Sequence, residues 1–473
     1  MRHSMHDLLQ RAYNDCKLIG DLPSEQLPIV HGATPSSYQL LAMFDGVAVV
    51  STAKARHALH QIGERYIGRH PETLEGVSYR TLHSTVSQQF VKWYVAFREQ
   101  HRSARMRDGQ RFVRQLERVL EEGKEAITHY VPCQLFMSPG PSIQIGPVLL
   151  TSTSEWLEQH KSELSNPVWI DVERSHVEAF GWVAEVPVSA SEPRRSLDHA
   201  RLALDALFGV FGILFNVDSS QMPWCNDQAA RLNTYISLTR RTDGPNPWAL
   251  MVGVNTNHPI LMHGAAASAF LQSRREILDA VGRCLFTFVG NEAPKSRIPK
   301  LHRRWVESMY WYGEGLHAGL PGVAVAKFET ALEVLTHARS TRATHGFLIY
   351  VGSAWLRVSL DHVIIDDPRL TYSDFVQRFS KTRSEILHGN RHTFFGTIDS
   401  EQQLAGFIVG QILLICAVRL SQYEATANPE DTFQGFRRWD NGSSAAIAPT
   451  RLPSWLATCG RYVITKWKSI RFP

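Results

Sequence analysis

Arg383 and His388 lie five positions apart, toward the end of a segment whose apolar spacing predicts a helix. Histidine has an unperturbed pKa of about 6.5, so it can accept or release a proton near neutral pH. Arginine stays charged, and its planar fork matches a phosphate that gains charge in a transition state. Together they could cleave RNA without a metal, with Ser384 orienting the imidazole or contacting phosphate. The pair also fits a solvated helix end, because this spacing often arises by chance.

The helix that must position these residues is predicted to begin at Thr371. A hydroxyl there and a carboxylate at Asp374 are spaced as in a capping box. The next core positions recur at spacings of four, three and four and share one helical face: Phe375, Phe379, Thr382 and Ile386. On this helical wheel, Arg383 lies on the flank of the apolar face and His388 lies away from it. The Gly-Asn pair after His388 is expected to end the helix.

Two short stretches carry a family resemblance. Residues 383–389 read Arg-Ser-Glu-Ile-Leu-His-Gly, and residues 328–335 read Phe-Glu-Thr-Ala-Leu-Glu-Val-Leu. With these motifs, residues 303–423 resemble a HEPN domain of the Apea-like kind, a four-to-five-helix bundle found in RNA-cleaving toxins and antiviral effectors. The first stretch matches the family's Arg-x4-His followed by Gly, and the second resembles its earlier core helix, with the acidic residue at Glu333. Many active members have Asn, Asp or His directly after the arginine, where this chain has Ser384.

The resemblance implies an endoribonuclease that cleaves RNA by transesterification and leaves a 2′,3′-cyclic phosphate. It assigns His388 as the acid/base group and Arg383 as the group that holds phosphate, with Ser384 assisting. Glu333 and Asn390 are implied as supporting residues. It implies no metal and no cofactor. The i, i+4 pair of His388 and His392 also suggests a metal site, but the intervening Gly-Asn is expected to break the helix.

The resemblance also implies partners. The Arg/His helices of two protomers usually meet in this family, so we expect a homodimer through the bundle. Single-stranded RNA or a tRNA loop is the expected substrate, because an unpaired 2′-hydroxyl can swing in line with the phosphorus. A bacterial antiviral (abortive-infection) or toxin role follows, with a phage protein as a candidate trigger. The alternative is a non-catalytic helical module that binds RNA or a partner protein, with Arg383 and His388 in its interface.

Composition indicates a soluble globular protein. The chain has 473 residues, enough for two or three domains, and 44% of them are hydrophobic and 20% charged. A formal net charge of +5 is compatible with a nucleic-acid partner but does not require one. Six scattered cysteines without a CxxC indicate neither a disulfide scaffold nor a zinc cluster, and a reducing cytoplasm fits best.

No membrane segment is predicted. Residues 1–7 are polar and do not resemble an export signal. The most apolar run, residues 406–418, is too short to span a bilayer and contains Gln411. We expect this run to form a central helix of the bundle.

The predicted fold class is α+β with several domains. Residues 1–124 are expected to form a helical N-terminal region, and residues 125–295 a mixed α/β domain that senses or regulates. Residues 296–425 are expected to form the HEPN-like bundle, and residues 426–473 a basic and aromatic tail. The second region contains no phosphate-binding Gly-rich loop and no nucleophile elbow. The arginines of residues 102–118 and the tail could contact nucleic acid, but a solvated face and a docked tail are the simpler interpretations.

Periodicity places the individual elements. Strands are predicted at residues 128–136, 142–152, 167–172, 177–188, 234–239 and 247–254. Helices are predicted at residues 7–19, 36–44, 53–67, 79–122, 196–215, 265–290, 305–316, 323–337, 344–361 and 402–423. A Gly-rich connection that includes Gly313, Gly315 and Gly322 is expected to join two helices of the bundle.

Overall fold

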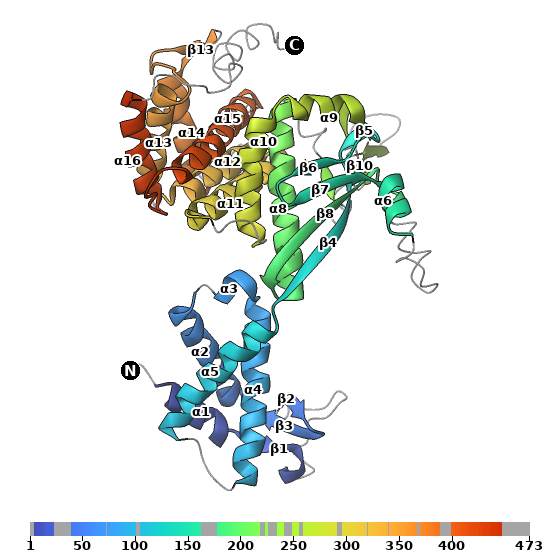
Figure 1. Cartoon of the computed structure of the whole chain (residues 1–473), viewed down its shortest axis with the longest axis vertical. Helices are drawn as coiled ribbons and strands as arrows, with labels where there is room; N and C mark the ends of the chain where they lie inside the picture. Colours follow the sequence, from blue (N-terminus) through green and yellow to red (C-terminus); the bar gives the residue numbers. More distant parts are fainter. Residues whose placement is uncertain are drawn as a thin grey trace. The chain divides into compact units, whose positions relative to one another are not determined.

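The computed structural model describes most of the chain (Figure 1). The described residues are 4–22, 39–71, 73–100, 105–161, 177–217, 223–225, 234–240, 248–254, 259–290, 296–318, 320–338, 340–366, 369–387 and 399–446. The fold is mixed α+β, as predicted, and it divides into two compact units. Unit 1 comprises Met1–Ile127 and Val188–Asp198, and unit 2 comprises Thr128–Pro187 and His199–Pro473.

Unit 1 combines helices with a small sheet. Its helices are α1 (Met5–Asn14), α2 (Ala53–Arg69), α3 (Thr73–Gly76), α4 (Tyr79–Glu99) and α5 (Met106–Glu122). Its antiparallel sheet has the order β1-β3-β2, with β1 (Cys16–Leu18), β2 (Gln39–Phe44) and β3 (Val47–Ser51). Apolar faces of the helices meet in one core, which includes Leu9, Ile62, Leu82, Phe90 and Phe112. Removal of these side chains from water stabilises the unit.

Three predictions in unit 1 were wrong. The single helix expected at residues 79–122 is two helices, α4 and α5. Residues 39–44 form strand β2 where a helix at residues 36–44 was expected, and residues 16–18 form β1 where the first helix was expected to continue. The reason is the Asp45-Gly46 turn, in which both residues have positive φ and which pairs β2 with β3. Asp-Gly between apolar runs is a strong hairpin signal, and it outweighs the helical spacing of the residues before it.

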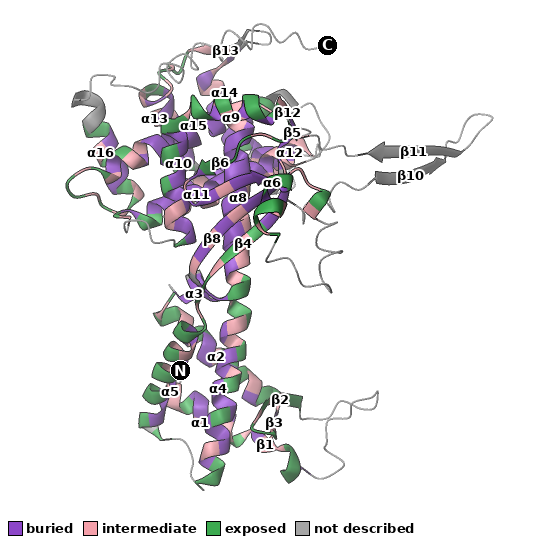
Figure 2. Cartoon of the chain, turned by 45° about the vertical axis from the view of Figure 1, so that its right-hand side comes forward, coloured by how far each residue is buried: buried purple, intermediate pink, exposed green. Residues whose placement is uncertain are grey.

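Unit 2 contains a sheet covered by helix α8. Among the described residues, the sheet has the order β6-β7-β8-β4-β9. Its strands are β4 (Glu125–Gln134), β6 (Ile143–Ile145), β7 (Val148–Ser152), β8 (Trp182–Ser191) and β9 (Trp224–Cys225). From His199 onward, α8 (Pro193–Phe215) is largely buried, with Leu204, Phe208 and Phe211 in the core (Figure 2).

Shorter elements complete this part of unit 2. They are β5 (Phe136–Ser138), α6 (Thr153–Gln159), β10 (Thr234–Arg240), β11 (Trp248–Val254), β12 (Ile260–His263) and α9 (Gly264–Gln272). Strand β12 pairs in parallel with β5, and β10 pairs with β11 as a hairpin. The predicted strand at residues 177–188 begins only at Trp182, after a short helical turn. The strand predicted at residues 167–172 lies outside the described residues.

A helical bundle forms the rest of unit 2, shown from yellow to red in Figure 1. Its helices are α10 (Arg275–Val289), α11 (Pro299–Leu316), α12 (Pro321–Thr336), α13 (Thr341–Ala354), α14 (Tyr372–Leu387), α15 (Asp399–Glu424) and α16 (Phe433–Ala446). Helix α12 packs against α11, α14 and α15, and α10 packs against α11 and α15. A two-stranded ribbon, β13 (Val363–Asp366) and β14 (Arg369–Thr371), precedes α14. The helix predicted at residues 265–290 is divided at Ser273 into α9 and α10, and the one predicted at 344–361 ends at Ala354.

The predicted Gly-rich connection is largely helix. Gly313 and Gly315 lie inside α11, and Gly322 lies in the first turn of α12. A Cβ on Gly315 would come within 2.5 Å of Cε1 of Phe328, so the glycine allows α11 and α12 to approach closely. The role of Gly315 is therefore helix packing, which spacing along the sequence alone did not reveal.

Helix α15 is the central apolar helix that the sequence predicted. Residues Gln402–Glu424 are long and apolar enough to cross a membrane, so the expectation that this run is too short was wrong. In the structure, 83% of the most apolar window is buried inside the protein. A helix that is apolar all round is typical of the core of a soluble protein when it is covered on all sides.

Candidate functional site

Helix α14 carries the predicted catalytic motif. Arg383 and Ser384 lie in its last turns, where the backbone is helical as predicted, and their side chains lie outside the described part of the structure. His388 and Asn390 also lie outside the described residues. What the structure establishes is the environment of the helix that presents the motif.

The start of α14 has the predicted capping arrangement. The Thr371 hydroxyl accepts a hydrogen bond from the backbone N–H of Asp374 at 3.1 Å. In return, the Asp374 carboxylate accepts the Thr371 backbone N–H at 3.0 Å and its hydroxyl at 2.7 Å. These bonds satisfy donors that the first turn of a helix leaves without partners. They fix the residue at which the helix begins and therefore the phase of every later position.

The buried face of α14 is the one that periodicity indicated. Phe375, Phe379 and Thr382 are buried, and Ile386 is half-buried. A Cβ on Gly322 would lie 3.2 Å from Cδ1 of Ile386, which shows how closely α12 approaches this face. Arg383 directly follows the buried Thr382, so its backbone lies beside the face that packs on α12.

A buried acid on α12 is a feature that the sequence prediction missed. Glu329 is fully buried, whereas Glu333, the acid expected from the family resemblance, is half-buried one turn later. Both residues make polar interactions. A carboxylate inside a protein requires a proton or a cationic or hydrogen-bonding partner. The position of Glu329 in the sequence could have predicted this burial. Glu329 lies four residues after Val325 and three before Leu332, which are both buried in the apolar stripe of α12.

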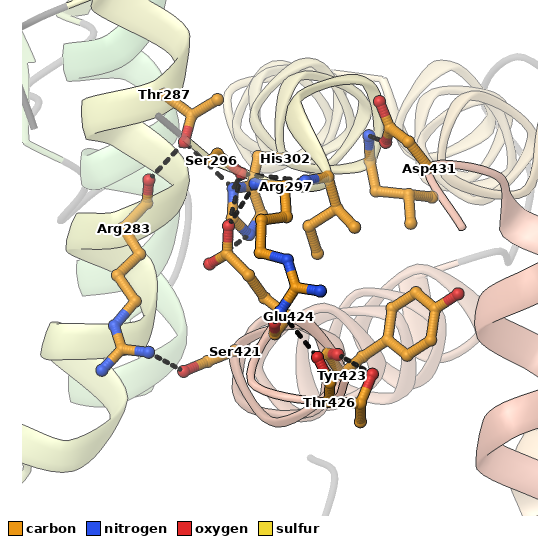
Figure 3. Close-up of polar contacts among 12 residues, drawn as sticks. Arg283, Thr287, Ser296, Arg297, His302, Ser421, Tyr423, Glu424, Thr426 and Asp431 are labelled. Atoms are coloured by element: carbon orange, nitrogen blue, oxygen red, sulfur yellow. Dashed lines mark hydrogen bonds and ion pairs between the residues drawn. The ribbon is translucent and has the colours of Figure 1, made fainter. Parts of the chain in front are cut away.

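A second histidine of the bundle is enclosed in a polar network (Figure 3). His302, on α11, is 1% exposed. Its Nδ1 lies 3.0 Å from the Thr287 hydroxyl and 3.1 Å from the Ser296 hydroxyl. Its Nε2 lies 3.9 Å from the Glu424 carboxylate. Burial lowers the pKa of His302, and the opposing attraction of Glu424 and Asp431 is the smaller effect.

Hydrogen bonds through Glu424 hold two ends of the bundle together. Glu424 accepts from the Ser296 hydroxyl at 2.6 Å and from the Arg297 backbone N–H at 2.9 Å. The Arg297 guanidinium donates to main-chain carbonyls just after α15, including that of Thr426 at 2.7 Å. Asp431 caps the first turn of α11 by accepting the N–H groups of Lys300 and Leu301. Because His302 is enclosed, this network supports the fold and does not offer a group to a substrate.

A cavity of about 470 Å³ opens beside the β6–β7 hairpin in unit 2. Its lining includes Gln144, Arg275, Asp279 and Arg283. Arg283 donates to the Ser421 hydroxyl at 2.8 Å, and Nε of Arg275 lies 3.9 Å from the Asp279 carboxylate, so both arginines have partners within the protein. The cavity is polar and suits a small polar ligand more than an apolar one.

Comparison with known proteins provides no relative for this chain. The sequence matches no protein-family model and no curated protein, and no solved structure matches the fold. Any inference about the function of this site must therefore come from its own residues and from the packing of α14.

Proposed function

We propose that this protein is a metal-independent endoribonuclease of the HEPN type, acting in the cytoplasm as a bacterial antiviral or toxin effector. The observation that carries the proposal is the placement of Arg383 near the end of a capped helix, beside the face that packs on α12. His388 follows the last described residue of α14 in the sequence. Glu329, a buried acidic residue, lies on α12, the helix against which α14 packs.

Each residue of the motif has a role in the proposed reaction. An imidazole at position 388 takes the proton of a 2′-hydroxyl, and the oxygen attacks the adjacent phosphorus. Arg383 holds the phosphate as it gains charge, and Ser384 assists. The bond to the 5′-oxygen breaks, that oxygen is protonated, and a 2′,3′-cyclic phosphate remains. When two copies meet, two imidazoles supply the base and the acid of one composite site.

The other regions would regulate this site. In the proposed layout, residues 296–425 form the catalytic bundle and residues 1–295 restrain it or recognise a trigger such as a phage protein. The substrate would be single-stranded RNA or a tRNA loop, where the backbone is free to reach the in-line geometry.

The integrity of RNA tests the catalytic assignment. Wild-type protein, activated by co-expressed phage proteins, is expected to cleave RNA to products with 2′,3′-cyclic ends, and cleavage should persist in chelator. His388→Asn is expected to lower the rate at least about 100-fold, because general acid–base catalysis contributes about 10²–10⁴-fold. Arg383→Ala is expected to lower it by about 10²–10³-fold, because it removes a group that stabilises the charge of the transition state.

Two control variants show whether a loss of cleavage is specific to Arg383 and His388, or follows from removing any cation or any histidine. Lys381→Ala removes an exposed cation from the same helix, and His337→Asn replaces an exposed histidine whose left-handed backbone suits Asn. Both are expected to cleave normally. If Arg383→Ala and His388→Asn cleave as the wild type does, the ribonuclease assignment is lost, and RNA binding without cleavage would indicate the non-catalytic module.

A further inference from the structure

Three side chains of the types that bind metal ions lie close together in unit 1, far from the Arg383 motif in the sequence. His60 and Glu64 lie one turn apart on α2, and His83 lies on α4. A nitrogen of each histidine and an oxygen of the carboxylate all lie within 4.8 Å of one another. The Nε2 of His83 is 3.5 Å from Oε1 of Glu64. Packing of α2 on α4 brings these side chains together.

The neighbouring residues hold two of these side chains in position. The Tyr79 hydroxyl donates to Oε1 of Glu64 at 2.5 Å, which fixes the direction of the carboxylate. The His83 ring lies against the backbone of α2, since a Cβ on Gly63 would come within 2.4 Å of its Cε1. The Nε2 of His83 is buried and has no hydrogen-bond partner. This nitrogen faces the Glu64 carboxylate at 3.5 Å, which is within ion-pair distance.

The spacing of these atoms fits tetrahedral coordination. Donors that bind zinc at about 2.0–2.2 Å in a tetrahedron lie about 3.3–3.6 Å from one another. The 3.5 Å between His83 Nε2 and Glu64 Oε1 is already close to this value. The rings of His60 and His83 are stacked, with centroids 4.6 Å apart. His60 is exposed, so a change of its side-chain rotamer can bring its nitrogen to the metal.

We propose that His60, Glu64 and His83 form a Zn²⁺ site that links α2 to α4, with Tyr79 orienting the carboxylate ligand. Two imidazoles and one carboxylate are a donor set that zinc accepts, and three protein ligands leave one position for water. A hydrogen bond from an outer residue to a ligand is the usual support of such a site. The proposal is independent of the ribonuclease assignment, because unit 1 does not contain the Arg383 motif.

Metal binding to the full-length chain tests the site. Protein without a polyhistidine tag is stripped with chelator, dialysed, and titrated with Zn²⁺ by calorimetry and with Co²⁺ by visible absorption. The wild type is expected to bind one equivalent and to show the d–d bands of tetrahedral Co²⁺. Zn²⁺ should also raise its unfolding temperature, because a ligand that binds only the folded state stabilises it.

Variants show whether these residues are the ligands. Glu64→Gln and His83→Asn are expected to abolish stoichiometric binding. Tyr79→Phe removes only the hydroxyl and should weaken binding about 10-fold to 100-fold. The matched control is His57→Ala, which removes an exposed histidine from the same helix and should leave the affinity unchanged.

Two results would overturn the proposal. One is a wild type that binds no Zn²⁺ equivalent, and the other is full binding by both Glu64→Gln and His83→Asn. Circular dichroism of each variant shows whether it is folded. Should His83→Asn fail to fold, Glu64→Gln decides alone, because Glu64 is exposed and the substitution keeps its shape.

Discussion

At the scale of single residues, buried polar groups distinguish this fold from a generic helical protein. His302, Glu329 and Asp440 are each 1% exposed or less. Asp440 on α16 accepts hydrogen bonds from the Tyr350 hydroxyl and from the indole N–H of Trp355 at 2.6 Å. His302 contacts groups on α10 and α15, and Asp440 contacts Tyr350 on α13, so each joins helices that are distant in the sequence. Such groups stabilise one arrangement over others, because an altered packing would leave them without partners.

The burial of His302 is expected to make the free energy of unfolding depend on pH. Because burial lowers the pKa of His302 from 6.5 in the folded state, the unfolded chain binds more protons between about pH 6.5 and the lower pKa of the folded state. The free energy of unfolding should therefore be highest above pH 6.5 and fall as the pH drops below it, by up to about 1.4 kcal/mol per pH unit. Urea unfolding from pH 8 to pH 5 measures this slope.

A variant isolates the contribution of His302 from that of the other histidines. His302→Gln removes the titrating group, so its slope below pH 6.5 should be shallower than that of the wild type. His337→Asn is the exposed control and is expected to keep the wild-type slope. Equal slopes for His302→Gln and wild type would contradict the link between burial of His302 and pH.

At the scale of elements, α12 organises the bundle. It packs against α11, α14 and α15, and its buried side includes Phe328 and Leu332. Small residues on its neighbours allow this approach: Gly315 on α11 and Gly406 on α15 both face the Phe328 ring. The distance between α14 and α12, and with it the position of the Arg383 backbone, depends on how closely these helices pack.

Two glycine substitutions test this packing. Gly315→Ala places a methyl group against the Phe328 ring, so it should destabilise the protein by about 1–3 kcal/mol. Gly346→Ala, inside α13, meets no atom within 4 Å and should be neutral or stabilise by up to about 1 kcal/mol, because alanine favours helix. Urea unfolding compares the two. A Gly315→Ala variant as stable as Gly346→Ala would mean that the close approach of α11 and α12 is not needed.

At the scale of the whole molecule, the proposed reaction requires two copies of the chain. One chain supplies one Arg383 and one His388, whereas the composite site uses those of two protomers. The two units have separate candidate roles: unit 1 contains the proposed zinc site, and unit 2 contains the helix that carries the motif.

The mass in solution tests the composite site. Light scattering of the purified protein is expected to show a particle of twice the 53.5 kDa chain mass, at least in the activated state. The Arg383→Ala variant should keep this mass, since it removes a catalytic group and leaves the rest of the bundle intact. A protein that cleaves RNA while remaining strictly monomeric would contradict the two-copy site.

The sequence by itself determined the features that depend on neighbouring residues. The capping box at Thr371, the buried face of α14 and the apolar stripe of α12 were all predicted, because caps and helical periodicity are local. The assignment of Arg383 and His388 as catalytic residues remains a prediction from the motif. Hairpin β2–β3 was missed, although its Asp-Gly turn was also a local signal.

Only the tertiary structure decided which polar residues meet or become buried. Glu329 and Glu333 are both acids on one helix, and packing of the neighbouring helices is what buries the first completely. His83 reaches Glu64 only because α4 packs on α2. Contacts of this kind join residues on separate elements. Their free energy depends on the surrounding packing and dielectric, and the spacing of residues along a single helix does not predict either.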